Sequence, residues 1–249
     1  MMWTEWQSRQ PPLFNTAVAH AALFALFVIL AMIDGTQITG INRWIKPMKF
    51  AVSIAIYLAS MAWYWPVAIA SAQAKQYAAL VLAGTMIFET AIISIQAARG
   101  LRSHFNVDTP MDATLFYTMG VAIIVNIIAA AFVCRWTFRA EPTPYVWGVR
   151  LGLMSFIVFA LQGILMVRRL AHSVGVPDGG PGLPVVNWST TGGDLRIAHF
   201  LGMHALQLLP ILGFLTRSTP AVAMAFAVWA ALSIAALWRA LAGKPLSMG

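Results

Sequence analysis

Charged side chains are scarce in this sequence. Aspartate, glutamate, lysine and arginine make up 10% of its 249 residues, whereas a soluble globular domain contains about 25%. Hydrophobic residues account for 60%, and the mean hydropathy is +0.76. A chain with so few charges and so much apolar surface is not an ordinary soluble domain, and its composition indicates a membrane protein.

Cysteine and acidic residues are also scarce. The single cysteine, Cys134, excludes an internal disulfide and any zinc site built from several cysteines. Only 8 acidic residues oppose 16 basic ones, which gives a net charge of +8. The basic residues lie in short connections between apolar runs, where membrane orientation and lipid headgroups account for them. We therefore expect no nucleic-acid partner.

Long apolar runs are abundant, and seven of them reach the length of about 20 residues that a membrane-spanning helix needs. The first run is longer than the core of a signal peptide and no small-residue cleavage site follows it, so we expect a retained helix. The sequence predicts an all-α polytopic membrane protein with a single domain (1–249) and one long loop (171–193). Its expected helices are 13–33, 48–70, 77–98, 113–134, 147–167, 195–216 and 220–241.

Lysine and arginine divide unevenly between the two ends of these helices, ten against six. Because short cytoplasmic loops are richer in basic residues, we expect the N-terminus outside, the C-terminus inside and the long loop on the cytoplasmic side of a bacterial inner membrane. The ten expected inside are Arg43, Lys46, Lys49, Arg99, Arg102, Arg168, Arg169, Arg196, Arg239 and Lys244, and the six outside are Arg9, Lys75, Arg135, Arg139, Arg150 and Arg217.

The predicted helix 195–216 carries polar side chains within an apolar run. Arg196, His199, His204 and Gln207 fall on one arc about 140° wide at about 100° per residue. A polar group in hydrocarbon costs several kcal/mol unless it is paired or faces a cavity. We therefore expect this arc to face the inside of the bundle and its histidines to have partners there.

A second polar group lies on and after the third predicted helix. Glu89 is the one acidic residue in the middle of a predicted span, and an intramembrane carboxylate is by default a candidate functional group. Gln96 shares its face, since residues seven apart nearly align on a helix. The connection that follows contains Arg102, His104 and Asp108, and the ordinary alternative is that Asp108 and Thr109 cap the next helix.

Three further candidates have ordinary alternatives. Gln162, near the inner end of the fifth predicted helix, is either part of a polar site or a simple interhelical hydrogen bond. Lys46 and Lys49, with Trp44, form a pattern typical of an interfacial anchor. The alternative is that the two lysines and Arg102 bind an anionic group of a substrate.

The first of three functional hypotheses is a metal-dependent membrane enzyme. His104, His199 and His204 would hold a divalent ion such as zinc, and Glu89, His104 and Asp108 would take part in catalysis, with a carboxylate as general base. The substrate would be lipid-like or amphipathic. Its candidate binding residues are Gln96, Arg102, Gln162, Arg196, Gln207, Lys46 and Lys49.

The seven helices, the Ser-His-x-x-x-Asp pattern of residues 103–108 and the two late histidines superficially resemble the membrane-embedded zinc hydrolases of the alkaline ceramidase and adiponectin-receptor type. One departure is clear. His199 and His204 are five residues apart rather than four, which places their rings about 140° apart around a regular helix and about 7.5 Å apart along it.

The second hypothesis is a haem-binding protein with a histidine of helix 195–216 as axial ligand. The third is a carrier or receptor for a small polar or anionic molecule, with a Glu and His site that binds protons. The sequence favours the metal-dependent enzyme by a narrow margin. We expect membrane lipids and a small-molecule or lipid-like ligand as partners, and the sequence leaves the oligomeric state open.

Overall fold

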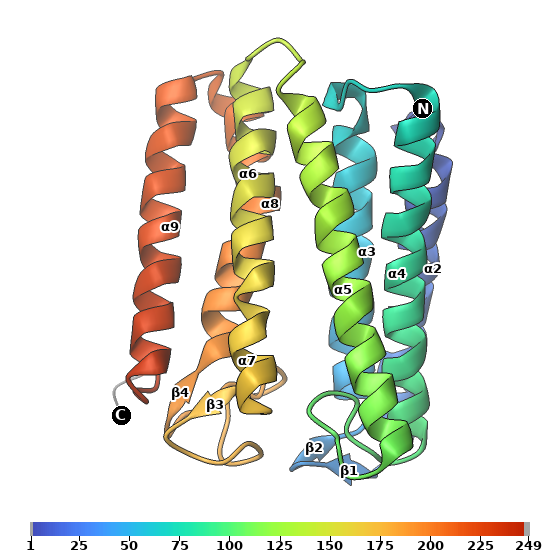
Figure 1. The fold of residues 1–249 in the computed structure, drawn as a ribbon, viewed down its shortest axis with the longest axis vertical. Coiled ribbons are helices and arrows are strands. Elements are labelled where there is room, and N and C mark those ends of the chain that lie inside the picture. The colour runs from blue at the N-terminus through green and yellow to red at the C-terminus, as the bar shows by residue number, and fades with distance from the viewer. Residues whose placement is uncertain (1, 247–249) are drawn as a thin grey trace. The chain divides into compact units, whose positions relative to one another are not determined.

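The chain folds almost entirely into α-helices. The computed structural model describes residues 2–246 and is 73% helical. Within this part of the chain, seven helical segments are long and apolar enough to cross a membrane, which confirms the predicted all-α, seven-helix, multi-pass membrane protein (Figure 1). The spans are α2 (Pro11–Ile33), α3 (Ile45–Tyr64) with the 3-10 turn η1 (Trp65–Val67), α4 (Ala72–Ala98), α5 (Pro110–Thr137), α6 (Pro144–Leu161) with α7 (Gly163–Arg169), α8 (Leu195–Thr216) and α9 (Thr219–Leu241).

Several helices begin a few residues before the apolar runs that predicted them. In α4 the Ser71 hydroxyl accepts a hydrogen bond from the Ala74 N–H at 3.2 Å, and in α6 the Thr143 hydroxyl accepts from Val146 at 3.3 Å. Such caps satisfy the free N–H groups of a first turn. Because capping residues are polar, hydropathy alone does not detect the turn that they start.

The chain divides into two compact units, unit 1 (Met1–Trp136) and unit 2 (Thr137–Gly249). Unit 1 contains the short N-terminal helix α1 (Met2–Arg9), helices α2 to α5, and the paired strands β1 (Gln37–Ile38) and β2 (Ile41–Asn42). Unit 2 contains α6 to α9 and the paired strands β3 (Ser173–Val174) and β4 (Gly193–Asp194). The single domain stays a prediction, and each unit is described by itself.

The connection between α2 and α3 is a small hairpin organised by Asp34. The Asp34 carboxylate accepts hydrogen bonds from the Thr36 N–H at 3.0 Å and from the Trp44 indole N–H at 2.8 Å, and it pairs with Arg43 at 2.5 Å. The hydrogen bonds from Thr36 and Trp44 hold the pKa of Asp34 well below its usual value.

Trp44 itself is buried in unit 1. Its ring stacks on Phe27, with the ring centres 5.9 Å apart, and only 9% of the residue is exposed. The Asp34 carboxylate and Phe27 therefore hold the indole inside unit 1, and the interfacial anchor expected for this segment stays a prediction. Lys46 and Lys49 lie in the first turn of α3 and are partly exposed.

Unit 2 is built on very close contact between α6 and α8. A Cβ atom at Gly148 would lie 2.4 Å from the Leu209 carbonyl oxygen, and one at Gly152 would lie 2.8 Å from Leu206 Cα. Small residues four apart let helix backbones approach closely in membranes. The Ser155 hydroxyl adds to this contact by donating a hydrogen bond to the carbonyl oxygen of Gly202, in α8, at 2.7 Å.

The long loop between α7 and α8 is folded rather than open. Asp178 accepts hydrogen bonds from the N–H groups of His172 (3.1 Å) and Ser173 (2.8 Å), and its carboxylate lies 2.9 Å from His172 Nδ1. Burial alone would raise the pKa of Asp178, but these bonds and the His172 ring together hold it well below its usual value. At the end of the loop, Asp194 caps α8 and pairs with Arg196 at 2.6 Å.

Candidate functional site: a buried carboxyl and histidine pair in unit 1

Glu89 lies about 13 Å before the C-terminal end of α4 at 1.5 Å per residue, and its side chain is 2% exposed. Its Oε1 atom is 3.5 Å from Nε2 of His104, and its Oε2 atom has no hydrogen-bond partner among the described residues. A buried polar oxygen without a partner costs free energy. Glu89 is therefore a candidate functional group.

His104 reaches Glu89 from the connection between α4 and α5. Its Nδ1 atom lies 3.2 Å from the Ser103 hydroxyl, and its ring packs against Phe50, Phe105 and Phe116 with ring centres 5.5 to 6.3 Å away. Its side chain is 24% exposed. His104 therefore connects the buried carboxyl with the loop surface, through an otherwise apolar wall.

Polar contacts at the base of this connection hold it in place. Asp112 accepts hydrogen bonds from Gln96 Nε2 at 2.9 Å, from Arg99 at 2.8 Å and from the Thr109 hydroxyl at 2.7 Å. Thr109 in turn caps α5, since its hydroxyl accepts from the Asp112 N–H at 3.1 Å. The amide group of Gln96, which was predicted to bind substrate, therefore helps to hold this connection in place.

Asp108 and Arg102 lie on the surface of the same connection. They form an ion pair at 3.3 Å, with side chains 70% and 43% exposed respectively. The sequence left Asp108 either as a catalytic residue or as a cap together with Thr109, and in the structure the hydroxyl of Thr109 is the cap. With its carboxylate turned to the surface, Asp108 does not join the buried pair.

Positive charge is also present at this end of unit 1. The ammonium of Lys46 acts electrostatically on the Glu89 carboxyl, and it lies 6.0 Å from the centre of the Phe50 ring. Figure 1 shows the β1–β2 hairpin and the connection between α4 and α5 at the same end of unit 1, where Arg43 donates to the Ala98 carbonyl at 3.0 Å. An anion that reached His104 would meet this charge.

His199, in the second turn of α8, and Gln162, between α6 and α7, both belong to unit 2. Nδ1 of His199 is 2.6 Å from the Phe159 carbonyl oxygen, so it donates there. Gln162 occupies the junction between α6 and α7, where its amide nitrogen is 3.5 Å from the Leu195 carbonyl and its amide oxygen is buried without a partner among the described residues. These two side chains lie on either side of the junction between α6 and α7.

The other polar residues of α8 bind local partners. Nδ1 of His204 lies 3.1 Å from the Gln207 amide oxygen, and its ring centre is 4.2 Å from that of Phe200. Arg196 pairs with Asp194 and donates to the Asn187 carbonyl. The polar arc of α8 is thus divided into separate hydrogen-bonded contacts.

A metal site would need several of these histidines to point at one ion. Among residues 2–246, no group of three or more His, Cys, Asp or Glu side chains is arranged to hold a metal. His104 belongs to unit 1, and His199 and His204 belong to unit 2. The metal-dependent enzyme and the haem protein stay predictions without a specific observation in their favour.

A second polar cluster lies inside unit 1, and the sequence did not show that its members touch one another. The Tyr57 hydroxyl donates to Asn126 Oδ1 at 2.9 Å, and Asn126 Nδ2 donates to the Thr85 hydroxyl at 2.7 Å, one helical turn before Glu89. His20, buried on α2, lies 3.0 Å from the Thr90 hydroxyl. Each residue is unremarkable alone, and only their mutual contacts show that the interior of unit 1 is polar.

The count of basic residues placed Arg150 outside the membrane and did not show that its side chain is buried. Only 3% of it is exposed, its guanidinium donates to the Thr137 and Ala140 carbonyls at 2.8 Å, and it lies about 5 Å from the ring centres of Phe138 and Trp147. It closes the turn between α5 and α6.

The chain was compared with protein-family models, curated proteins and solved structures, and none of the three comparisons gives a significant match.

Proposed function

We propose that this protein is a proton-binding membrane carrier in which Glu89 holds the proton and His104 exchanges it with the loop end of unit 1. One observation supports the proposal above all: a carboxyl 2% exposed lies 3.5 Å from a histidine 24% exposed. Intramembrane carboxyl and imidazole groups commonly form proton relays.

The exchange needs only the two side chains. With the His104 proton on Nδ1 and donated to the Ser103 hydroxyl, the Nε2 atom carries the lone pair that accepts the proton of Glu89. That transfer converts a neutral pair into a carboxylate and imidazolium pair with the same net charge. The imidazolium then releases its other proton at the loop side, which leaves Glu89 ionised until a proton returns along the same route.

An ionised Glu89 is costly without a compensating charge, because a carboxylate in a poorly hydrated interior loses its solvation. Lys46 supplies part of that charge. When Glu89 instead holds its proton, its carboxyl no longer offsets the charge of Lys46, and we propose that the carried solute is a small polar anion that approaches Lys46 and His104 in this state. The setting is the predicted bacterial inner membrane, with this end of unit 1 on the cytoplasmic side.

The test is an infrared titration of the purified protein in lipid, because the C=O band of a protonated carboxyl reports Glu89 directly. We expect one buried carboxyl band that disappears in Glu89→Gln and persists in Asp108→Asn. The second variant is a matched control, since it makes the same change in an exposed carboxylate of the same unit. An unchanged band in Glu89→Gln would refute the proposal.

The role of His104 is tested by the rate at which the Glu89 carboxyl exchanges its proton for deuterium. In His104→Gln the band should survive and exchange more slowly, because the residue that connects the carboxyl with the loop surface is gone. Equal exchange rates would mean that the proton takes another route.

The anion is tested by thermal unfolding in detergent with added acetate, phosphate or tetramethylammonium. We expect stabilisation by an anion and not by the cation, lost in Lys46→Gln and kept in Lys75→Gln, which removes a lysine from the opposite end of unit 1. Equal stabilisation of both variants would exclude a binding site at Lys46.

A further inference from the structure

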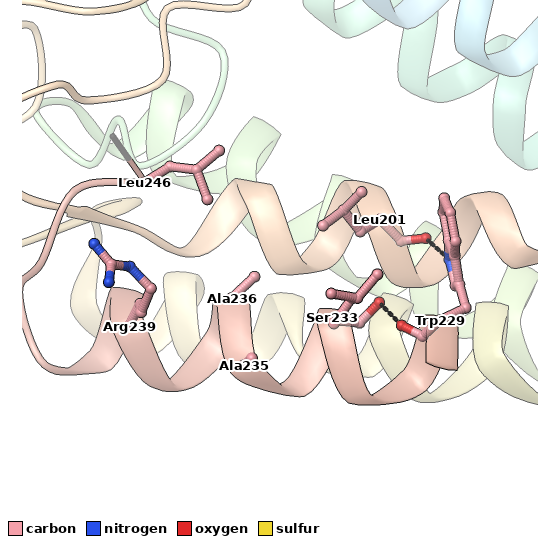
Figure 2. Close-up of a pocket in the computed structure, with 8 residues that line it drawn as sticks. Leu201, Trp229, Ser233, Ala235, Ala236, Arg239 and Leu246 are labelled. Carbon is pink, nitrogen blue, oxygen red and sulfur yellow. Dashed lines mark hydrogen bonds between the residues drawn. The ribbon is translucent and has the colours of Figure 1, made fainter. Parts of the chain in front are cut away.

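Unit 2 contains a groove between α8 and α9 that the proton site does not use. Its volume is 250 Å³, and Figure 2 shows Leu201 and Trp229 toward one end and Arg239 and Leu246 toward the other. The groove begins at Trp229, in the middle of α9, and reaches Arg239, near the C-terminal end of that helix.

Its length matches one leaflet of a bilayer. Trp229 and Arg239 are ten residues apart on α9, which corresponds to about 15 Å along the helix axis. The hydrocarbon core of a bilayer is about 30 Å thick, so a groove from the middle of a spanning helix to its end covers the depth of one lipid chain.

The walls of the groove are apolar because their polar groups bind each other. The Trp229 indole N–H donates to the Leu201 carbonyl at 2.7 Å, and the Ser233 hydroxyl donates to the Trp229 carbonyl at 2.9 Å, as Figure 2 shows. The surface left for a ligand between Trp229 and Arg239 is therefore suited to a hydrocarbon chain.

Arg239 supplies the polar end. One of its guanidinium nitrogens, Nη2, donates to the Pro245 carbonyl at 2.7 Å, but Nε is buried without a hydrogen-bond partner among residues 2–246. A buried guanidinium N–H without an acceptor is costly. An acceptor that reached the groove at Arg239 would remove that cost.

The charge balance around Arg239 favours an anion. The acidic residues of the neighbouring loop are already paired, Asp194 with Arg196 and Asp178 with His172. In the described part of the chain neither Arg239 nor the exposed Lys244 forms a salt bridge, so this end of unit 2 keeps unbalanced positive charge.

We propose that this groove binds one molecule of an anionic phospholipid. One acyl chain lies along the groove toward Trp229, and the phosphate accepts hydrogen bonds from Arg239 beside Lys244. The orientation predicted from the sequence places this end in the cytoplasmic leaflet, whose anionic lipids attract basic residues near the surface. The proposal is independent of the proton site in unit 1.

The experiment is native mass spectrometry of the whole purified protein with phosphatidylglycerol or phosphatidylcholine carrying the same acyl chains. We expect one phosphatidylglycerol to bind more tightly than phosphatidylcholine. Arg239→Gln should weaken its binding about fivefold, the effect expected for one basic residue at an anionic leaflet. The control is Arg217→Gln, at the opposite end of α8, which should leave binding unchanged.

A second variant tests the groove itself. Ala235→Phe should fill the groove and weaken both lipids, whereas Ala223→Phe, which enlarges an exposed alanine outside the groove, should not. Equal binding of the two lipids, or a preference for phosphatidylglycerol that survives in Arg239→Gln, would overturn the proposal. Free phosphate that displaces the lipid at equal concentration would also overturn it, because the acyl chain would then contribute nothing.

Discussion

An alanine at Gly148 is expected to push α6 and α8 apart. A Cβ atom there would lie 2.4 Å from the Leu209 carbonyl oxygen, whereas real Cβ atoms almost never come within 3.0 Å of a heavy atom, so the backbones must separate by at least about 0.6 Å. The obstructing atom belongs to the main chain of α8. No side-chain rotation can relieve the contact.

The expected cost follows from two opposing effects. Overpacking a close-packed interior costs about 1–3 kcal/mol, and the rigid backbone at Leu209 places Gly148→Ala at the upper end of that range. Replacing a helical glycine by alanine stabilises the helix itself by about 1 kcal/mol. We therefore expect Gly148→Ala to lower the free energy of unfolding by about 2 kcal/mol, combining these two effects.

The assay is reversible unfolding in mixed detergent micelles, followed by circular dichroism. Gly163→Ala is the control within unit 2, because its Cβ would make an ordinary contact at 3.5 Å with the His199 ring, and we expect it to be neutral or slightly stabilising. If Gly148→Ala is as stable as Gly163→Ala, the close approach of α6 and α8 is refuted.

Three further predictions concern unit 1 and the orientation. Tyr57→Phe leaves Asn126 without its donor and should destabilise the protein by about 1 kcal/mol in the same unfolding assay. The pKa of Asp34 is held below its usual value of about 3.9, so the ionised carboxylate stabilises the folded protein above that pH, and this stabilisation is lost as the pH falls further. The Asp34→Asn variant should therefore be less stable than the wild type at neutral pH and approach its stability in acid. In a cysteine-free background, Glu5→Cys should react with a membrane-impermeant thiol reagent outside intact cells and Lys244→Cys should not, and the reverse result would invert the predicted topology.

The spanning helices were predictable because each follows from a local property, about 20 apolar residues in a row. The elements between them depend on single hydrogen bonds across short distances. The Asp34 hairpin needs Thr39 and Gly40 at positive φ and a carboxylate that binds Trp44, and neither feature changes the hydropathy of the segment. From the sequence, Trp44 was therefore expected to be part of an interfacial anchor, and its burial against Phe27 was not foreseen.

The candidate site was predictable in its members but not in its pairing. Glu89 and His104 each stand out in the sequence, Glu89 as an intramembrane acid and His104 as a histidine in a polar connection. Their proximity depends on Asp112, which holds the intervening connection through Gln96 and Arg99. Asp108 is exposed because Thr109 takes the capping position that either residue type can fill.

The two units use different means to bury their polar groups. In unit 2 the helices pack at glycines, and the buried Arg150 and the partly buried His199 donate to main-chain carbonyls. In unit 1 polar side chains bind each other, as Asn126 binds Thr85 one turn before Glu89, whose Oε2 has no hydrogen-bond partner among the described residues. Substitutions at the glycine contacts of unit 2 should therefore change stability and leave the infrared band of Glu89 unaltered, because proton exchange depends on side chains of unit 1.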